Sequence, residues 1–81
     1  MVRVKHHTLD ASNLLCPLPV IRTQDRVSQL QAGDVLTVYC TDPGALSDIP
    51  AWCRIHGHHM LNQSEETDGL ITLVLQVGDP S

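Results

Sequence analysis

Basic residues and large aromatic rings are both scarce in this chain of 81 residues. Five Lys and Arg stand against nine Asp and Glu, which gives a formal net charge of -4. This sign is wrong for coating a phosphate backbone, so we expect no direct binding to nucleic acid. There is no Phe, one Tyr and one Trp, but the apolar fraction of 42%, supplied by Val, Leu, Ile and Ala, is typical of a globular protein.

Long apolar runs are also missing. None approaches the length of a membrane span, and the N-terminal stretch Met-Val-Arg-Val-Lys-His-His lacks the apolar segment of a secretory signal. We therefore expect a cytoplasmic protein with no membrane partner. The length allows one small domain, residues 1–81, whose thin core leaves little room for an internal substrate cavity.

The sequence offers no pair of cysteines in a Cys-x-x-Cys motif and no acid–base pair or cofactor motif. Its three Cys cannot all pair with one another, so at least one thiol stays free. We expect no cofactor and no metal. The nearest approach to a metal site is Cys53 with His56, His58 and His59, but we expect Cys53 to point into the core, and both later His residues follow the helix-ending Gly57.

The spacing of apolar residues and chain breakers predicts the order βαβαββ. We expect strands over residues 5–10, 34–41, 59–65 and 70–77, and helices over residues 17–31 and from an N-cap at Ser47 to Gly57. Short strand–helix–strand connections require parallel pairing, and the closing hairpin around Thr67-Asp68-Gly69 adds an antiparallel pair. The predicted fold is α/β, a two-layer sandwich with two helices on one face of a four-stranded mixed sheet.

The same patterns predict which side chains form the core. Leu9 is the best candidate in the first strand, and Cys40 alternates with Leu36 and Val38 as a small buried residue. The second helix should bury Ile49, Trp52, Cys53 and His56, and the last strand Ile71, Leu73, Leu75 and Val77. Pro50 should lie in the first turn of its helix, where a missing N–H does no harm, and His6 and His7 should be solvated.

The chemically distinctive motif is Cys16-Pro17-Leu18-Pro19. Pro17 suits the first position of a helix and Pro19 its first turn, which predicts Cys16 as the N-cap. The sulfur would then face the positive end of the helix and the free N–H groups of Leu18 and Val20. These should lower the thiol pKa below its ordinary value of about 8.5 and favour a nucleophilic thiolate.

Two alternatives accompany this interpretation. Cys16 could be only a small helix cap, although Ser, Thr, Asp and Asn are the usual caps. Asp10 and Asp42 are expected near Cys16 as supporting residues, but each could equally cap a turn.

Together, several motifs resemble the TusA (SirA/YedF-like) sulfur-carrier family from about residue 8 to residue 77. They are Thr8-Leu9-Asp10, Leu14-x-Cys16-Pro17-x-Pro19, Gly33-Asp34, Thr41-Asp42-Pro43, Asp48-Ile49-Pro50-x-x-Cys53 and Thr67-Asp68-Gly69. The resemblance implies a single TusA-like domain with a two-layer α/β sandwich. It also implies a persulfide on Cys16 that a cysteine desulfurase or rhodanese loads and a downstream acceptor receives.

The acceptor classes that the resemblance implies are a TusBCD-type relay for tRNA thiolation and DsrE or DsrEFH-type proteins of sulfur oxidation. Two departures bear on partner choice. Many relatives have Arg-Gly before the cysteine where this chain has Ser12-Asn13, and several tRNA-thiolating relatives have Glu at the position of Leu18. The alternative function is a non-catalytic interaction or regulatory module that binds protein through its open sheet face.

Overall fold

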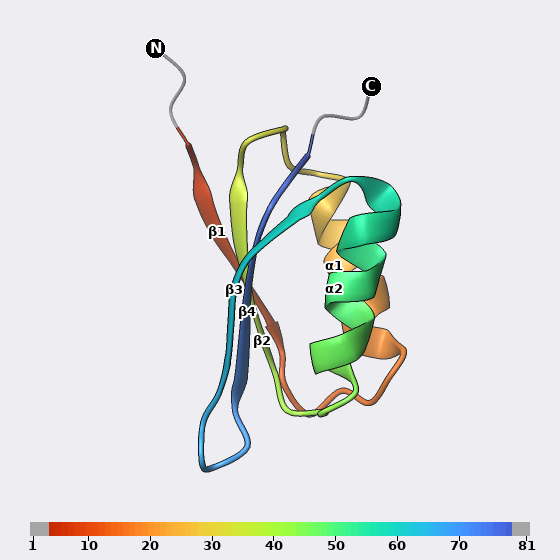
Figure 1. Ribbon diagram of the computed structural model, residues 1–81, viewed down its shortest axis with the longest axis vertical. Coiled ribbons are helices and arrows are strands. Elements are labelled where there is room, and N and C mark those ends of the chain that lie inside the picture. The colour runs from red at the N-terminus through yellow and green to blue at the C-terminus, as the bar shows by residue number, and fades with distance from the viewer. Residues whose placement is uncertain (1–3, 79–81) are drawn as a thin grey trace.

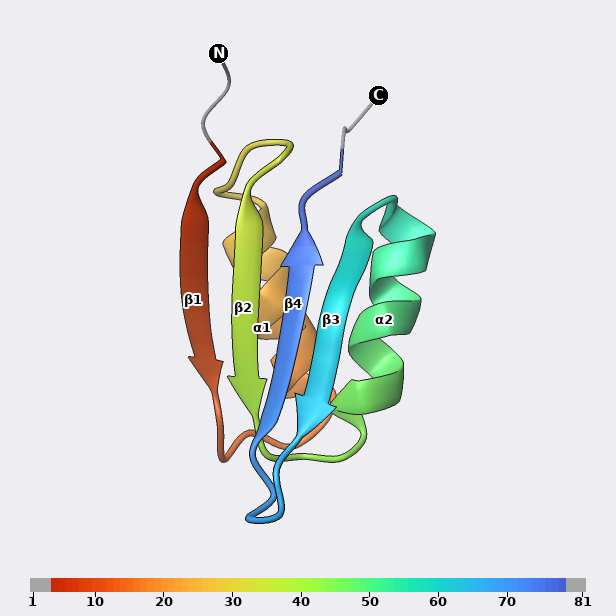
Figure 2. The ribbon, with the colours of Figure 1, turned by 60° about the vertical axis from the view of Figure 1, so that its left-hand side comes forward.

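Six elements follow one another in the predicted order in the computed structural model, which describes residues 4–78. They are β1 (His6–Ala11), α1 (Leu18–Val27), β2 (Val35–Cys40), α2 (Ala45–His56), β3 (His59–Glu65) and β4 (Ile71–Gln76). The sheet has the order β1-β2-β4-β3, with β1 parallel to β2 and the other two pairs antiparallel. Both helices cover one face (Figures 1 and 2), so the predicted α/β sandwich is confirmed.

The core lies between this face and the helices. Alternate residues of the two central strands have no exposed surface, because β2 and β4 are paired on both sides and covered by α1 and α2. These residues are Leu36, Val38, Cys40, Ile71, Leu73 and Leu75, joined by Ile49 and Cys53 from α2. In β1 the fully buried residue is Ala11, while the predicted Leu9 packs at the edge of the core.

Both helices differ from the predicted bounds at one end. α1 stops at Val27 because the next N–H groups bond three residues back, Gln29 to Arg26 and Leu30 to Val27. α2 begins at Ala45 with Gly44 as N-cap, so the predicted cap Ser47 lies inside the helix. Pro50 therefore lies in the helix interior, where it cannot donate the usual backbone hydrogen bond.

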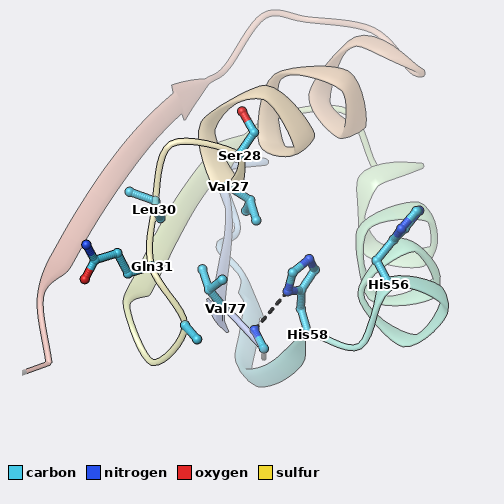
Figure 3. Close-up of a pocket in the computed structure, with 9 residues that line it drawn as sticks. Val27, Ser28, Leu30, Gln31, His56, His58 and Val77 are labelled. Atoms are coloured by element: carbon cyan, nitrogen blue, oxygen red, sulfur yellow. Dashed lines mark hydrogen bonds between the residues drawn. The ribbon is translucent and has the colours of Figure 1, made fainter. Parts of the chain in front are cut away.

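At the C-terminal end of α2, His58 ties the helix to the sheet. Gly57 adopts a left-handed conformation with φ 78°, and the His58 N–H then donates to the Cys53 carbonyl at 2.8 Å. The Gly78 N–H donates to His58 Nδ1 at 2.9 Å (Figure 3), and the His58 ring stacks on Trp52 at 4.9 Å. His58 is thus a structural residue that accepts a hydrogen bond as the neutral imidazole.

A second histidine also departs from the prediction. His7 is half-buried and its Nε2 lies 3.3 Å from Asp34 Oδ2, so it is paired rather than solvated, whereas His6 is exposed. The Asp34 carboxylate also accepts the N–H of Gln31, which is the main reason that its pKa lies below the ordinary value. Within residues 4–78, neither helix is long and apolar enough to cross a membrane.

Shortening a side chain on the covered face of the sheet should lower the free energy of unfolding more than shortening one on the open face. We expect Leu73→Ala to lower the free energy of unfolding by about 2–5 kcal/mol, because it opens a cavity in the core. Val74→Ala, on the adjacent position of β4 and the opposite face, should cost clearly less. Urea unfolding followed by Trp52 fluorescence measures both. Equal losses would contradict the assignment of faces.

Acid should weaken the fold through His58. Burial, then the neighbouring His56 and His59, lower its pKa from 6.5, so the unfolded chain takes up the proton first as the pH falls. This contribution to stability is complete above pH 6.5 and is lost as the pH falls below it. Urea unfolding at about pH 7.5 and about pH 5.5 should therefore show less pH dependence in His58→Asn than in the unchanged protein. His6→Asn, a change at an exposed histidine of β1 that takes no part in lowering the His58 pKa, should leave that dependence as it is.

Candidate functional site

Two connections meet at one end of the sheet, and Cys16 lies in one of them. Since β1 and β2 are parallel, the β1–α1 loop and the β2–α2 loop leave the sheet at the same edge (Figures 1 and 2). Asn13 turns the first loop with φ 65°, and its N–H donates to Thr41 Oγ1 at 2.9 Å. The Cys16 N–H donates to Asp42 Oδ2 at 2.6 Å. Side chains that follow β2 thus hold the cysteine loop.

The sulfur of Cys16 lies against the start of α2. Its thiol donates to Asp48 Oδ2 at 3.1 Å, and Asp48 belongs to the first turn of that helix. Gly44 leaves the necessary space, because a Cβ atom there would lie 3.0 Å from the Cys16 sulfur. The functional cysteine candidate is therefore positioned by α2 as much as by α1.

The predicted capping role of Cys16 is wrong. Pro17 occupies the N-cap position of α1, and the peptide bond that precedes it is cis. The two N–H groups expected to face the sulfur are already used, since Leu18 donates to the Leu15 carbonyl at 2.9 Å and Val20 to the Pro17 carbonyl at 3.1 Å. The start of α1 consequently offers the sulfur no free backbone donor from these two residues.

The predicted direction of the thiol pKa is also wrong. The hydrogen bond to Asp48, then burial, then the Asp42 carboxylate raise the pKa of Cys16 from 9.0 to about 12. Negative charge beside a sulfur disfavours the thiolate, and no cation in residues 4–78 offsets it. The pKa of Asp42 itself is lowered, first by the N–H groups of Cys16 and Gly44. At rest, Cys16 is a protonated thiol.

The other predicted site residues fall into two groups. Asp42 contacts Cys16 as expected, whereas Asp10 accepts hydrogen bonds from the backbone and hydroxyl of Ser12 and makes no hydrogen bond to Cys16. Pro19 is buried, while Leu18 is 42% exposed. Leu15, on the other side of Cys16, is 74% exposed, so the sulfur has apolar neighbours open to a partner.

Cys40 and Cys53 have no exposed surface, as predicted, and burial raises the pKa of both thiols. Cys53 lies 3.7 Å from the sulfur of Met60, inside the core. In the described part of the chain, no group of three or more His, Cys, Asp or Glu side chains could hold a metal ion. Of the three cysteine sulfurs, that of Cys16 alone is open to a partner.

Asp48 is the residue that sequence reasoning missed. It entered the motif Asp48-Ile49-Pro50 without a role, because the helix was expected to start at Ser47 and nothing local connects it with Cys16. The two residues are 32 positions apart and meet only in the folded chain. The usable signal was the membership of Asp48 in the motif Asp48-Ile49-Pro50, which marked the residue without giving it a role.

A pocket of about 710 Å³ lies elsewhere, between the C-terminal ends of the helices and the end of β4 (Figure 3). Its walls are lined by Val27, Leu30 and Val77, with the rings of His56 and His58 on one side. α1 runs from Leu18, beside Cys16, to Val27 at the pocket, which is about 15 Å of helix. The pocket is therefore separate from the chemistry of the sulfur.

Comparison with known proteins agrees with this geometry. Residues 7–77 match the family described as sulfurtransferase TusA. A candidate sulfur carrier protein of Neisseria meningitidis serogroup A is 52% identical over 69 residues, which are 85% of this chain and 92% of the relative. The sulfur carrier protein TusA of Pseudomonas entomophila is 49% identical over 59 residues, 73% of this chain and 74% of that protein.

A solved structure is also similar. The crystal structure of a SirA-like protein from Desulfitobacterium hafniense superposes with a TM-score of 0.79 at 27% identity. The match covers 90% of this chain and 99% of the other.

Proposed function

Since this chain belongs to the TusA family, we propose that it is a sulfur carrier whose cargo is a persulfide on the Cys16 sulfur. The terminal sulfur of a donor persulfide is attacked by Cys16, the S–S bond of the donor breaks, and the donor leaves as a thiol. The Cys16 proton balances that leaving thiolate, so the exchange needs no oxidant or reductant. The relatives named as sulfur carriers support the general role.

One observation carries the choice of residue. Cys16 is partly exposed in a loop held by Thr41 and Asp42, while Cys40 and Cys53 have no exposed surface. A carrier must present its sulfur to two different proteins in turn, so the group has to be both accessible and fixed in position. Cys16 meets both requirements. Pro17, Leu18 and Pro19 support it by fixing the start of α1 and the apolar side of the site, and Asp42 supports it by binding its backbone.

The proposed partners follow from the resemblance to the family. A cysteine desulfurase or a rhodanese, both of which form enzyme persulfides, would be the donor. The acceptor would be a protein of the TusBCD, DsrE or DsrEFH type, which places the exchange in the cytoplasm and leads to tRNA thiolation or sulfur oxidation. Exposed Leu15 and Leu18 would exclude water around the reacting sulfurs when a partner docks. Asp10, whose carboxylate binds Ser12 at the same edge of the sheet, would keep the turn before Asn13 in shape.

Sulfur loading should depend on Cys16 alone. After incubation with a cysteine desulfurase and cysteine, the intact mass of the protein should rise by one sulfur that a reducing thiol removes. Cys16→Ser should abolish this gain and leave the thermal midpoint nearly unchanged, because its side chain lies outside the core. Cys53→Ser should lower the thermal midpoint but keep the gain in the folded fraction.

Two results would contradict the assignment. Undiminished loading of Cys16→Ser would move the site to another residue. No sulfur gain by the unchanged protein from a desulfurase or a rhodanese would favour the interaction module, in which the uncovered face of the sheet binds a protein and Cys16 is structural.

Leu18 should select the acceptor. We expect Leu18→Glu to slow transfer from the loaded carrier to its acceptor by at least about tenfold, because a charge replaces an apolar contact beside the sulfur. Loading from the desulfurase should change less. Ile55→Glu, on an exposed apolar residue near the far end of α2, is the matched control and should affect neither step. Intact mass measures the two steps separately, and equal transfer by Leu18→Glu and the unchanged protein would show that acceptor choice lies elsewhere.

A further inference from the structure

Asp48 is the carboxylate that contributes most to the raised pKa of the Cys16 thiol, ahead of Asp42, which also lies close to the sulfur. The contact joins the thiol to Asp48 Oδ2 at 3.1 Å, which is short for a bond in which sulfur is the donor. No other hydrogen bond reaches the Asp48 carboxylate from the described residues, and its side chain is exposed. The group is therefore free to exchange its partner during a reaction.

The second carboxylate at the site is differently engaged. Asp42 accepts the N–H of Cys16 at 2.6 Å and the N–H of Gly44 at 3.1 Å, and both bonds stabilise its charged form. Its role is to hold the loop, and it cannot give up these bonds without moving Cys16. Of the two carboxylates, Asp48 is thus the one available to handle a proton.

We propose that Asp48 is a catalytic residue of the sulfur transfer, which holds the Cys16 proton and delivers it to the departing thiolate of the donor. The inference rests on the proposed carrier function. As the Cys16 sulfur bonds to the terminal sulfur of the donor, the Cys16 proton passes to Asp48 Oδ2. The donor's S–S bond breaks, its electron pair stays on the leaving sulfur, and that sulfur takes the proton from Asp48. Cys16 ends as a persulfide, the donor ends as a thiol, and Asp48 returns to its starting state.

The arrangement is compatible with the absence of a cation beside the Cys16 sulfur among residues 4–78. A thiolate at Cys16 would lie beside two carboxylates, but the charge of a persulfide anion resides on the outer sulfur, one S–S bond or about 2 Å further away. Asp48 consequently protects the empty carrier from reagents that attack thiolates while it tolerates the loaded form. Removing the charge of Asp48 should therefore speed the reaction of Cys16 with alkylating reagents and slow its uptake of sulfur from a persulfide donor.

Asp48→Asn keeps the size and an acceptor oxygen but cannot take up and return a proton. Two rates are measured for Cys16 by peptide mapping and intact mass: alkylation by iodoacetamide and sulfur uptake from glutathione persulfide. Alkylation releases iodide, which needs no proton, whereas sulfur uptake releases a thiolate, which does. Near pH 7.5, we expect alkylation of Asp48→Asn to be at least about tenfold faster than in the unchanged protein, because a neighbouring negative charge is gone.

Both rates depend on the nucleophilicity of Cys16, but only sulfur uptake releases a thiolate that needs a proton. The ratio of the rate of sulfur uptake to the rate of alkylation therefore measures the contribution of proton delivery. We expect this ratio to fall by about a hundredfold in Asp48→Asn and to recover in part in Asp48→Glu. Asp25→Asn, which removes an exposed carboxylate near the C-terminal end of α1, is the matched control and should change neither rate.

Each result that contradicts these expectations identifies a different error in the proposal. If the ratio is unchanged in Asp48→Asn, the carboxylate acts by its charge alone and the catalytic role is wrong. If alkylation is also unchanged, the contact between Asp48 and Cys16 does not form in solution. If the unchanged protein takes up no sulfur although Asp48→Asn alkylates faster, the carrier function fails, and the catalytic role with it, while the coupling of the two side chains stands.

Discussion

Parallel pairing of β1 with β2 is the constraint on which the site depends. It places the carboxyl ends of both strands at one edge of the sheet, so that the loops leading to α1 and α2 lie side by side. Thr41 and Asp42 follow β2 and hold the backbone of the other loop at Asn13 and Cys16. With antiparallel pairing the two loops would leave from opposite edges, and no side chain of the second loop could reach the cysteine.

A sulfur carrier has to keep its thiol unreactive between encounters and its persulfide available during them. The usual way to activate a cysteine is to lower its pKa with a cation or a helix N-terminus. Here two carboxylates raise the pKa of Cys16 instead, and the N–H groups of Leu18 and Val20 donate to backbone carbonyls. Under the proposed carrier function, the reactivity of Cys16 therefore comes from the partner and from the proposed proton transfer at Asp48.

Contacts at the end of the molecule opposite the Cys16 loop stabilise the fold. His58 joins α2 to the end of β4 through Gly78, and its ring covers Trp52, the largest side chain in a core without Phe. The indole N–H of Trp52 has no hydrogen-bond partner among the described residues, so the packing of this ring depends on its apolar contacts and on stacking. Because the two ends are separate, the loop that contains Cys16 can be exposed without loosening the helix packing.

Local patterns in the sequence were sufficient for the architecture. Period-two alternation placed Leu36, Val38 and Cys40 on one face of β2 and Ile71, Leu73 and Leu75 on one face of β4, and turn residues separated the elements, because burial and backbone geometry are encoded locally. The motif around Cys16, together with the Asp-Pro and Asp-Ile-Pro motifs at their spacings, indicated the family. The ends of the helices were less predictable. Gly44 lies against the Cys16 sulfur of the other loop, and no residue pattern marked the change to shorter hydrogen-bonded turns after Val27.

The electrostatics of the cysteine were decided only by the tertiary structure. A helix start viewed alone predicts a lowered thiol pKa, but the sulfur turns away from α1 and toward Asp48, a residue 32 positions along the chain. Charge acts through space rather than along the sequence, so the sign of the shift could not be known before the two loops were brought together. The sequence by itself determined which atom is the candidate carrier, and the fold determined whether that atom rests as a thiol or a thiolate.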